Sequence, residues 1–320
     1  MTKTLLIFGF LFFSCFLFAQ REFTMQAVGS YTVKDKSKPL RIPFEFSDGD
    51  ILLKPRINGR ICSMYLDNGF IWDELYFFGS PVIDSLNFRY EAGEVQVGGQ
   101  GSGQPIVNKM ANGVNVEFEN LTFNDQPAII SPPELGMQKL FRADGQISAV
   151  FFKNFITEIN FDSMQITLHE PSVFIPGENF EPIPMTSSGD GSFSVPVIIG
   201  CQDKKIKSNL RLDLGGSCNF TLYFDGSSGF NFDNDSLKTL GYGSQGEIKG
   251  YSEQIQFFSI GKSKIRGLTG EFVRSSSSDK NISILGLEVL KLYNIIFDYH
   301  HNILYIKPNH LFHERTIKGK

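Results

Sequence analysis

The sequence predicts an all-β protein made of two homologous lobes with a few short helices, and three observations lead to this prediction. A motif in which an apolar strand delivers an Asp into a Gly turn occurs twice, at Asp67-Asn68-Gly69 and at Asp213-Leu214-Gly215. Apolar and polar residues alternate over much of the chain with the period of two that a half-buried strand has. A stretch rich in Pro, Gly and Ser lies between the two copies and interrupts regular structure.

The segments downstream of the two motifs are also duplicated. Residues 144–153 resemble 281–290, and 160–169 resemble 298–307. The equivalent positions Ser148 and Gly286 are 138 apart (286 − 148), as are the starts of the second pair of segments (298 − 160). The two Asp residues are 146 apart (213 − 67), so the second repeat is 8 residues shorter (146 − 138) in between. A period of this length is too long for a solenoid and fits two lobes of ordinary size.

Strands account for most of the remaining pattern. The clearest alternating segments are 95–97, 114–118, 194–199 and 254–257, each bounded by turn residues. Short helices are expected at 135–141, 149–155, 235–240 and 287–292. The linker is expected at 171–192, where four Pro residues and a Ser-Gly-Asp run exclude a regular pattern.

The first residues have the pattern of a secretory leader. A Lys at position 3 is followed by an apolar run that ends at the polar Gln20, and cleavage is expected near Ala19 or Gln20. We therefore expect a signal peptide at 1–20, a first lobe at 21–172 and a second lobe at 173–320. The product is expected to be secreted or periplasmic, with no stable membrane anchor.

The composition limits the possible partners and cofactors. A hydrophobic content of 41% with 32 Phe provides enough apolar mass for two cores, and a net charge of −4 does not favour nucleic acid as a partner. After cleavage the cysteines are Cys62, Cys201 and Cys218; Cys201 and Cys218 could form a disulfide, or each could be an inert buried thiol. No Cys and His spacing suggests a metal, so neither a metal nor a cofactor is expected.

The ordered motifs resemble those of the retropepsin-like and pepsin-like aspartic proteases, in the two-repeat form found in secreted bacterial homologues. The matching segments are the hairpin turn at 57–60, the first Asp motif, the Gly-rich stretch 98–103, the second Asp motif, the Gly-rich stretch 241–250 and the segment 284–286. The resemblance implies two acid-protease-like β-barrel lobes and a monomer with an internal pseudo-two-fold axis. It also implies a flap at 98–103, in which Gly99 and Gly101 would contact a peptide or unfolded protein substrate.

The resemblance assigns the catalytic role to Asp67 and Asp213, which would share one proton and activate a water molecule for peptide hydrolysis. It places Asn68, Gly69, Leu214 and Gly215 beside the substrate. The family has Thr or Ser after each Asp, with a hydroxyl that fixes the two carboxylates. Asn68 can donate and accept a hydrogen bond there, whereas Leu214 can do neither.

These departures leave two functions open. The first is a secreted aspartic endopeptidase, and the second is an inactive relative that binds a peptide or another ligand in the cleft between the lobes. A third, more distant reading is a pair of β-domains used for surface assembly, in which the two Asp turns would lie far apart. The alternative to a catalytic dyad is that each Asp only caps its own turn through backbone N–H groups.

Overall fold

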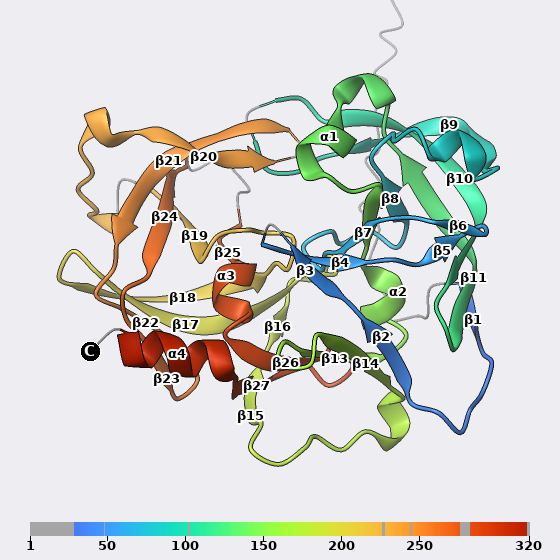
Figure 1. Ribbon diagram of the computed structural model, residues 1–320. Helices are drawn as coiled ribbons and strands as arrows, with labels where there is room; N and C mark the ends of the chain where they lie inside the picture. Colours follow the sequence, from blue (N-terminus) through green and yellow to red (C-terminus); the bar gives the residue numbers. More distant parts are fainter. Residues whose placement is uncertain are drawn as a thin grey trace, which may run out of the picture.

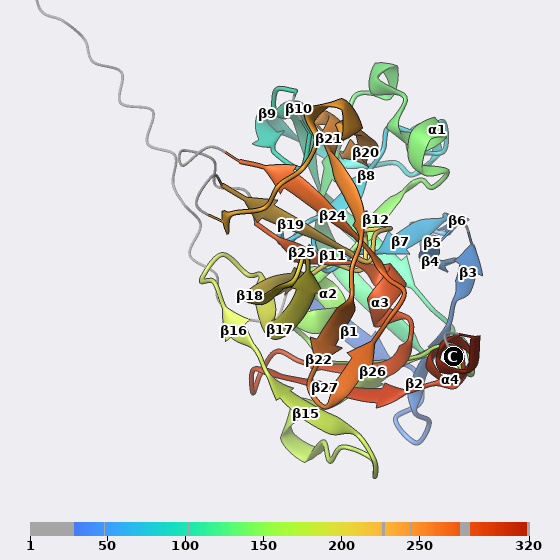
Figure 2. The same ribbon diagram turned by 90° about the vertical axis from the view of Figure 1, so that its left-hand side faces the viewer.

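The computed structural model describes residues 29–47, 49–101, 103–225, 228–243, 245–275 and 282–318. These residues form an all-β fold of two lobes with a few short helices, which confirms the predicted fold class (Figures 1 and 2). The expected leader at 1–20 lies outside the described residues. No helix in the described part of the chain is long and apolar enough to cross a bilayer.

The first lobe is built on an eleven-stranded sheet. Its strands are β1 (Ser30–Val33), β3 (Glu45–Ser47), β4 (Asp50–Leu53), β5 (Arg56–Ile57), β6 (Arg60–Ile61), β7 (Met64–Leu66), β8 (Leu75–Phe77), β9 (Arg89–Val97), β10 (Ile106–Glu117), β11 (Leu121–Ile130) and β12 (Gly145–Ile147). Strand β7 pairs in parallel with β12, and β12 pairs antiparallel with β8. Asp67 therefore leaves the sheet at the end of a central strand.

The second lobe repeats this arrangement in a ten-stranded sheet. Its strands are β16 (Thr186–Ser187), β17 (Phe193–Cys201), β18 (Lys204–Leu212), β19 (Phe220–Phe224), β20 (Lys238–Gly243), β21 (Gly246–Gln254), β22 (Phe257–Ile260), β23 (Ser263–Ile265), β24 (Thr269–Arg274) and β25 (Ile284–Leu285). Strand β18 pairs in parallel with β25, and β25 pairs antiparallel with β19. Asp213 follows β18 as Asp67 follows β7.

A six-stranded sheet joins the lobes at their base (Figure 1). In sheet order its strands are β15 (Glu181–Pro184), β27 (Ile303–Pro308), β26 (Tyr293–Asp298), β13 (Ile156–Asn160), β14 (Gln165–His169) and β2 (Leu40–Pro43). At its centre Glu158 lies opposite Ile296 in antiparallel pairing, and these residues are 138 apart (296 − 158). Each residue thus faces its own duplicate, which places the pseudo-two-fold axis between β13 and β26.

The short helices agree in part with the sequence. The α-helices are α1 (Met137–Phe141), α2 (Ala149–Phe152), α3 (Leu287–Leu290) and α4 (His310–Lys318), and the 3-10 turns are η1 (Ile83–Ser85), η2 (Pro133–Leu135), η3 (Pro171–Val173) and η5 (Asn234–Ser236). The expected helices after the duplicated apolar segments are present as α2 and α3. The helix expected at 235–240 is wrong, because η5 is a single turn and β20 begins at Lys238 to pair with β21.

Two further segments differ from expectation. The linker contains β15, which pairs with β27 although it carries Pro182 and Pro184; β15 is an edge strand of its sheet, where missing N–H donors are tolerated. The expected turn at 57–60 is confirmed, since Asn58 and Gly59 have φ of 46° and 84° between β5 and β6, as a tight hairpin turn requires. Cys62, Cys201 and Cys218 are free, so the possible disulfide is not formed.

Candidate active site

The two Asp motifs form equivalent turns. Asp67 Oδ1 accepts hydrogen bonds from the backbone N–H groups of Gly69 at 2.8 Å and Phe70 at 3.3 Å. Asp213 Oδ1 accepts one from the N–H of Gly215 at 3.1 Å. Each carboxylate therefore caps its own turn, as expected for an Asp in this position, and keeps its second oxygen for other partners.

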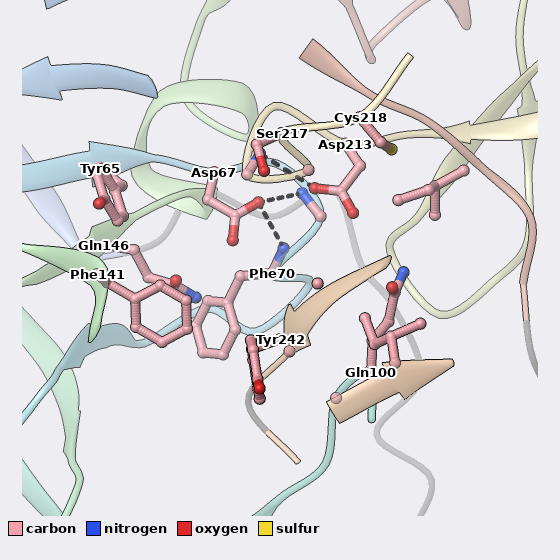
Figure 3. Close-up of a pocket in the computed structure, with 18 of the residues that line it drawn as sticks. Tyr65, Asp67, Phe70, Gln100, Phe141, Gln146, Asp213, Ser217, Cys218 and Tyr242 are labelled. Atoms are coloured by element: carbon pink, nitrogen blue, oxygen red, sulfur yellow. Dashed lines mark hydrogen bonds between the residues drawn. The ribbon is translucent and has the colours of Figure 1, made fainter. Parts of the chain in front are cut away.

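The two carboxyl groups, called the dyad below, lie together at the junction of the lobes (Figure 3). A Cβ atom added to Gly69 would lie 2.3 Å from Asp213 Oδ1, and one added to Gly215 would lie 2.5 Å from Asp67 Cγ. Real Cβ atoms do not approach other atoms so closely, so each Gly gives room to the carboxylate of the opposite lobe. This proximity contradicts the surface-assembly reading, in which the two Asp turns are far apart.

The protonation of the dyad is asymmetric. Burial, and then the charge of Asp213, raise the pKa of Asp67 to about 7. Burial also raises the pKa of Asp213, and Arg211 and backbone N–H groups lower the pKa of both carboxyl groups. A hydrogen bond with Asp67 lowers only the pKa of Asp213, as the charge of Asp213 raises only that of Asp67. These opposing effects favour a state in which Asp67 holds the proton and Asp213 carries the charge.

Arg211 is a site residue that the sequence reasoning missed. Its Nη2 lies 3.8 Å from Asp213 Oδ2, and both side chains are largely buried. Arg211 lies near the end of β18 and Asp213 follows the strand directly; residues two apart along an extended chain point to one face. The i, i+2 spacing from Asp213 is therefore the sequence feature that could have identified Arg211 as a site residue.

Asn68 connects the lobes behind the dyad. Its Oδ1 accepts a hydrogen bond from the backbone N–H of Leu214 at 2.7 Å, and its Nδ2 donates one to the Tyr299 hydroxyl at 2.9 Å. Asn68 is 5% exposed and Leu214 is 1% exposed, and neither lines the cleft in front of the dyad. The sequence predicts that both residues contact the substrate. In the structure Asn68 instead holds the second Asp turn by a hydrogen bond, and Leu214 packs in the core.

A cleft of about 320 Å³ opens in front of the dyad, between the lobes. Asp67, Gly69, Asp213 and Gly215 form part of its lining, and Gly99 lines it from the predicted flap. Gly101 does not line the cleft, because the loop turns there toward the other lobe and an added Cβ would lie 2.5 Å from the backbone of Gln245.

Two hairpins cover the cleft, one from each lobe. The first is β9–β10, whose tip carries the predicted flap, and the second is β20–β21. At the tips the N–H of Gly103 donates to the Gln245 carbonyl at 2.6 Å, and the N–H of Gln245 donates to the Gln100 carbonyl at 3.0 Å. Gln100 and Tyr242 thus face the dyad across the pocket (Figure 3).

The two walls of the cleft differ in chemistry. The first-lobe wall is mainly apolar and contains Phe70, Tyr76, Phe78, Val97, Met137 and Phe141. The second-lobe wall is mixed: it contains the polar residues Arg211, Ser217, Cys218, Thr221 and Glu271 beside the apolar or aromatic Leu240, Tyr242, Ile248 and Ile284. Within the described residues, no three His, Cys, Asp or Glu side chains cluster as metal ligands.

No protein-family model and no curated protein matches this chain. Among solved structures the chain is similar to basic 7S globulin from soybean, with 12% sequence identity and a TM-score of 0.49. This likeness covers 90% of the present chain and 97% of the globulin chain.

Proposed function

We propose that this protein is an aspartic endopeptidase in which Asp67 and Asp213 activate water for peptide hydrolysis. The observation that carries the proposal is the juxtaposition of the two carboxyl groups, each of which occupies space that only a Gly of the opposite lobe leaves free. A pair of carboxyl groups that shares one proton can act as acid and base together. The cleft in front of the dyad supports an extended peptide as substrate.

The reaction follows from the asymmetry of the dyad. Ionised Asp213 takes a proton from a bound water, whose oxygen attacks the peptide carbonyl carbon, while Asp67 gives its proton to the carbonyl oxygen. In the resulting diol the carbon–nitrogen bond then breaks. Asp213 passes its proton to the leaving amine, and Asp67 recovers a proton from a diol hydroxyl. No electrons are exchanged, and both carboxyl groups return to their initial state.

Leu214 favours a second candidate function, a protein that binds peptides in the same cleft without cutting them. Its side chain is 1% exposed and apolar, so Asp213 lacks the neighbouring hydroxyl that the protease family has. The Asn68 bond to the Leu214 N–H supplies part of this bracing from the other lobe. This bond is the reason to place the peptidase first.

Peptidase activity on a denatured protein separates the two candidates. We expect the wild type to cut it, and we expect Asp67→Asn and Asp213→Asn each to lose the cutting while they remain folded. Asp235→Asn is the matched control, because Asp235 is exposed and does not line the cleft. A wild type that binds the denatured protein but never cuts it would establish the binding function instead.

A further inference from the structure

Two neighbouring strand positions that recur in both lobes beside the cleft carry different residues. In the first lobe, Tyr76 of β8 lies beside Ile129 of β11 in parallel pairing. In the second lobe, Thr221 of β19 lies beside Glu271 of β24 in the same parallel relation. The duplication therefore equates Tyr76 with Thr221, and Ile129 with Glu271.

In the first lobe these positions belong to an aromatic cluster. The Tyr76 ring stacks on Phe70 with centroids 5.4 Å apart, and it contacts Phe78 edge to face at 5.6 Å. Phe141 extends the cluster, with its centroid 5.1 Å from that of Phe78. A side chain that enters the cleft on this side meets aromatic rings, which favour an aromatic or large aliphatic group.

In the second lobe the equivalent positions hold Thr221 and Glu271, so a carboxylate lies there. The Thr221 hydroxyl donates a hydrogen bond to Glu271 Oε2 at 2.8 Å, and Glu271 lines the cleft. Thr221 is smaller than Tyr76, so in the second lobe the carboxylate of Glu271 takes the place that the Tyr76 ring has in the first lobe as the group facing a substrate. Burial raises the pKa of Glu271, while the Thr221 hydrogen bond and the charge of Lys238 lower it.

The net charge of the cleft also favours a cationic side chain in the substrate. Among the described lining residues the ionised acids are Asp50, Asp213 and Glu271, since Asp67 holds the proton of the dyad, and the one basic residue is Arg211. Arg211 is turned to Asp213 at 3.8 Å, so its charge is matched within the site. A net acidic cleft attracts a cationic side chain.

We propose that Glu271 is a specificity-determining residue that selects a Lys or Arg side chain at the second-lobe wall, while the first-lobe wall takes an aromatic or large aliphatic side chain. This inference rests on the proposed function, because it assumes that a peptide lies in the cleft. A half-buried carboxylate forms charge-assisted hydrogen bonds to an ammonium or guanidinium group, and these are about twice as strong as neutral ones.

The test uses peptides that have Phe on one side of the central bond and either Lys or norleucine on the other, in both orders. Norleucine has a side chain of nearly the same length as Lys but no charge. Each peptide is made in a cleavable form and in a form with a non-hydrolysable hydroxyethylene group. Binding and cleavage are then measured near neutral pH for the wild type, Glu271→Gln and Glu253→Gln.

In one order we expect the wild type to bind the Lys peptide more tightly than the norleucine peptide, by on the order of tenfold or more. Glu271→Gln should bind the two peptides equally, with its affinity for the norleucine peptide unchanged. Glu253→Gln should behave as the wild type, because Glu253 lies on the neighbouring β21 and does not line the cleft. Glu271→Asp, which keeps the charge on a shorter side chain, should retain part of the preference.

The outcomes separate the two proposals. If the wild type cuts both peptides equally well, the role of Glu271 is overturned and the peptidase stands. If the Lys preference depends on Glu271 in binding but no peptide is cut, the peptidase is overturned and the role of Glu271 stands. If no peptide binds in either order, both are overturned.

Discussion

The side-chain oxygen of Asn68 accepts a hydrogen bond from the backbone N–H of Leu214 at 2.7 Å, which joins the two lobes directly behind the dyad. The same Asn donates to Tyr299, whose ring stacks on Phe193 with centroids 3.9 Å apart. Asn68 thus holds the second Asp turn and is itself held by the base of the molecule. Asn68 is therefore a direct link between the turns that carry Asp67 and Asp213.

Asn68→Ala tests this bracing role. It removes the acceptor for the buried N–H of Leu214, and an unsatisfied buried donor costs about 1–3 kcal/mol. We expect the free energy of unfolding in urea to fall by about this amount and peptidase activity to fall further, because general-base catalysis depends on position. Asn231→Ala, at an exposed position, should change neither; an Asn68→Ala protein as stable as the wild type would contradict the bracing role.

Arg211→Gln tests the effect of the Arg211 charge on the pKa values of the dyad. The Arg211 charge lowers the pKa of both Asp67 and Asp213, so its removal should raise both pKa values. The pH profile of kcat/KM should therefore move as a whole to higher pH, and its alkaline limb should lie above the wild-type value of about 7. Arg41→Gln, at an exposed position, should leave the profile in place, and an unmoved profile for Arg211→Gln would refute the coupling.

The pH dependence of stability provides a test that needs no substrate. The pKa of Asp67 is raised from 3.8 to about 7 in the folded protein, so the folded state holds this proton more tightly than the unfolded state. The resulting stabilisation is complete below pH 3.8 and is lost as the pH rises through about 7. In urea titrations the wild type should lose stability relative to Asp67→Asn over this window; a constant difference between them would show that Asp67 has an ordinary pKa.

The features that the sequence predicts well are those encoded locally and then repeated. The two Asp-x-Gly turns, the hairpin turn at Asn58 and Gly59 and the Gly-rich flap each depend on a few adjacent residues, and duplication makes them recognisable. The offset of the duplicated hairpins is also correct, since it brings Glu158 opposite Ile296.

Other features depend on pairing between distant segments, which no local pattern shows. The contact of Thr221 with Glu271 arises from the register of two parallel strands 50 residues apart. Gln245 meets Gly103 only because two hairpins from different lobes converge. Strand β15 contains two Pro residues and resembles a linker until β27 provides its partner.

The most direct test of the dyad is a double-mutant cycle on peptidase activity with Asp67→Asn, Asp213→Asn and the double variant. Two groups that share one proton act as a unit, so removal of either should abolish catalysis as fully as removal of both. We predict that kcat of each single variant equals that of the double variant, with all three proteins folded. If one single variant keeps substantial activity, or if the two losses multiply in the double variant, Asp67 and Asp213 do not work as one catalytic pair.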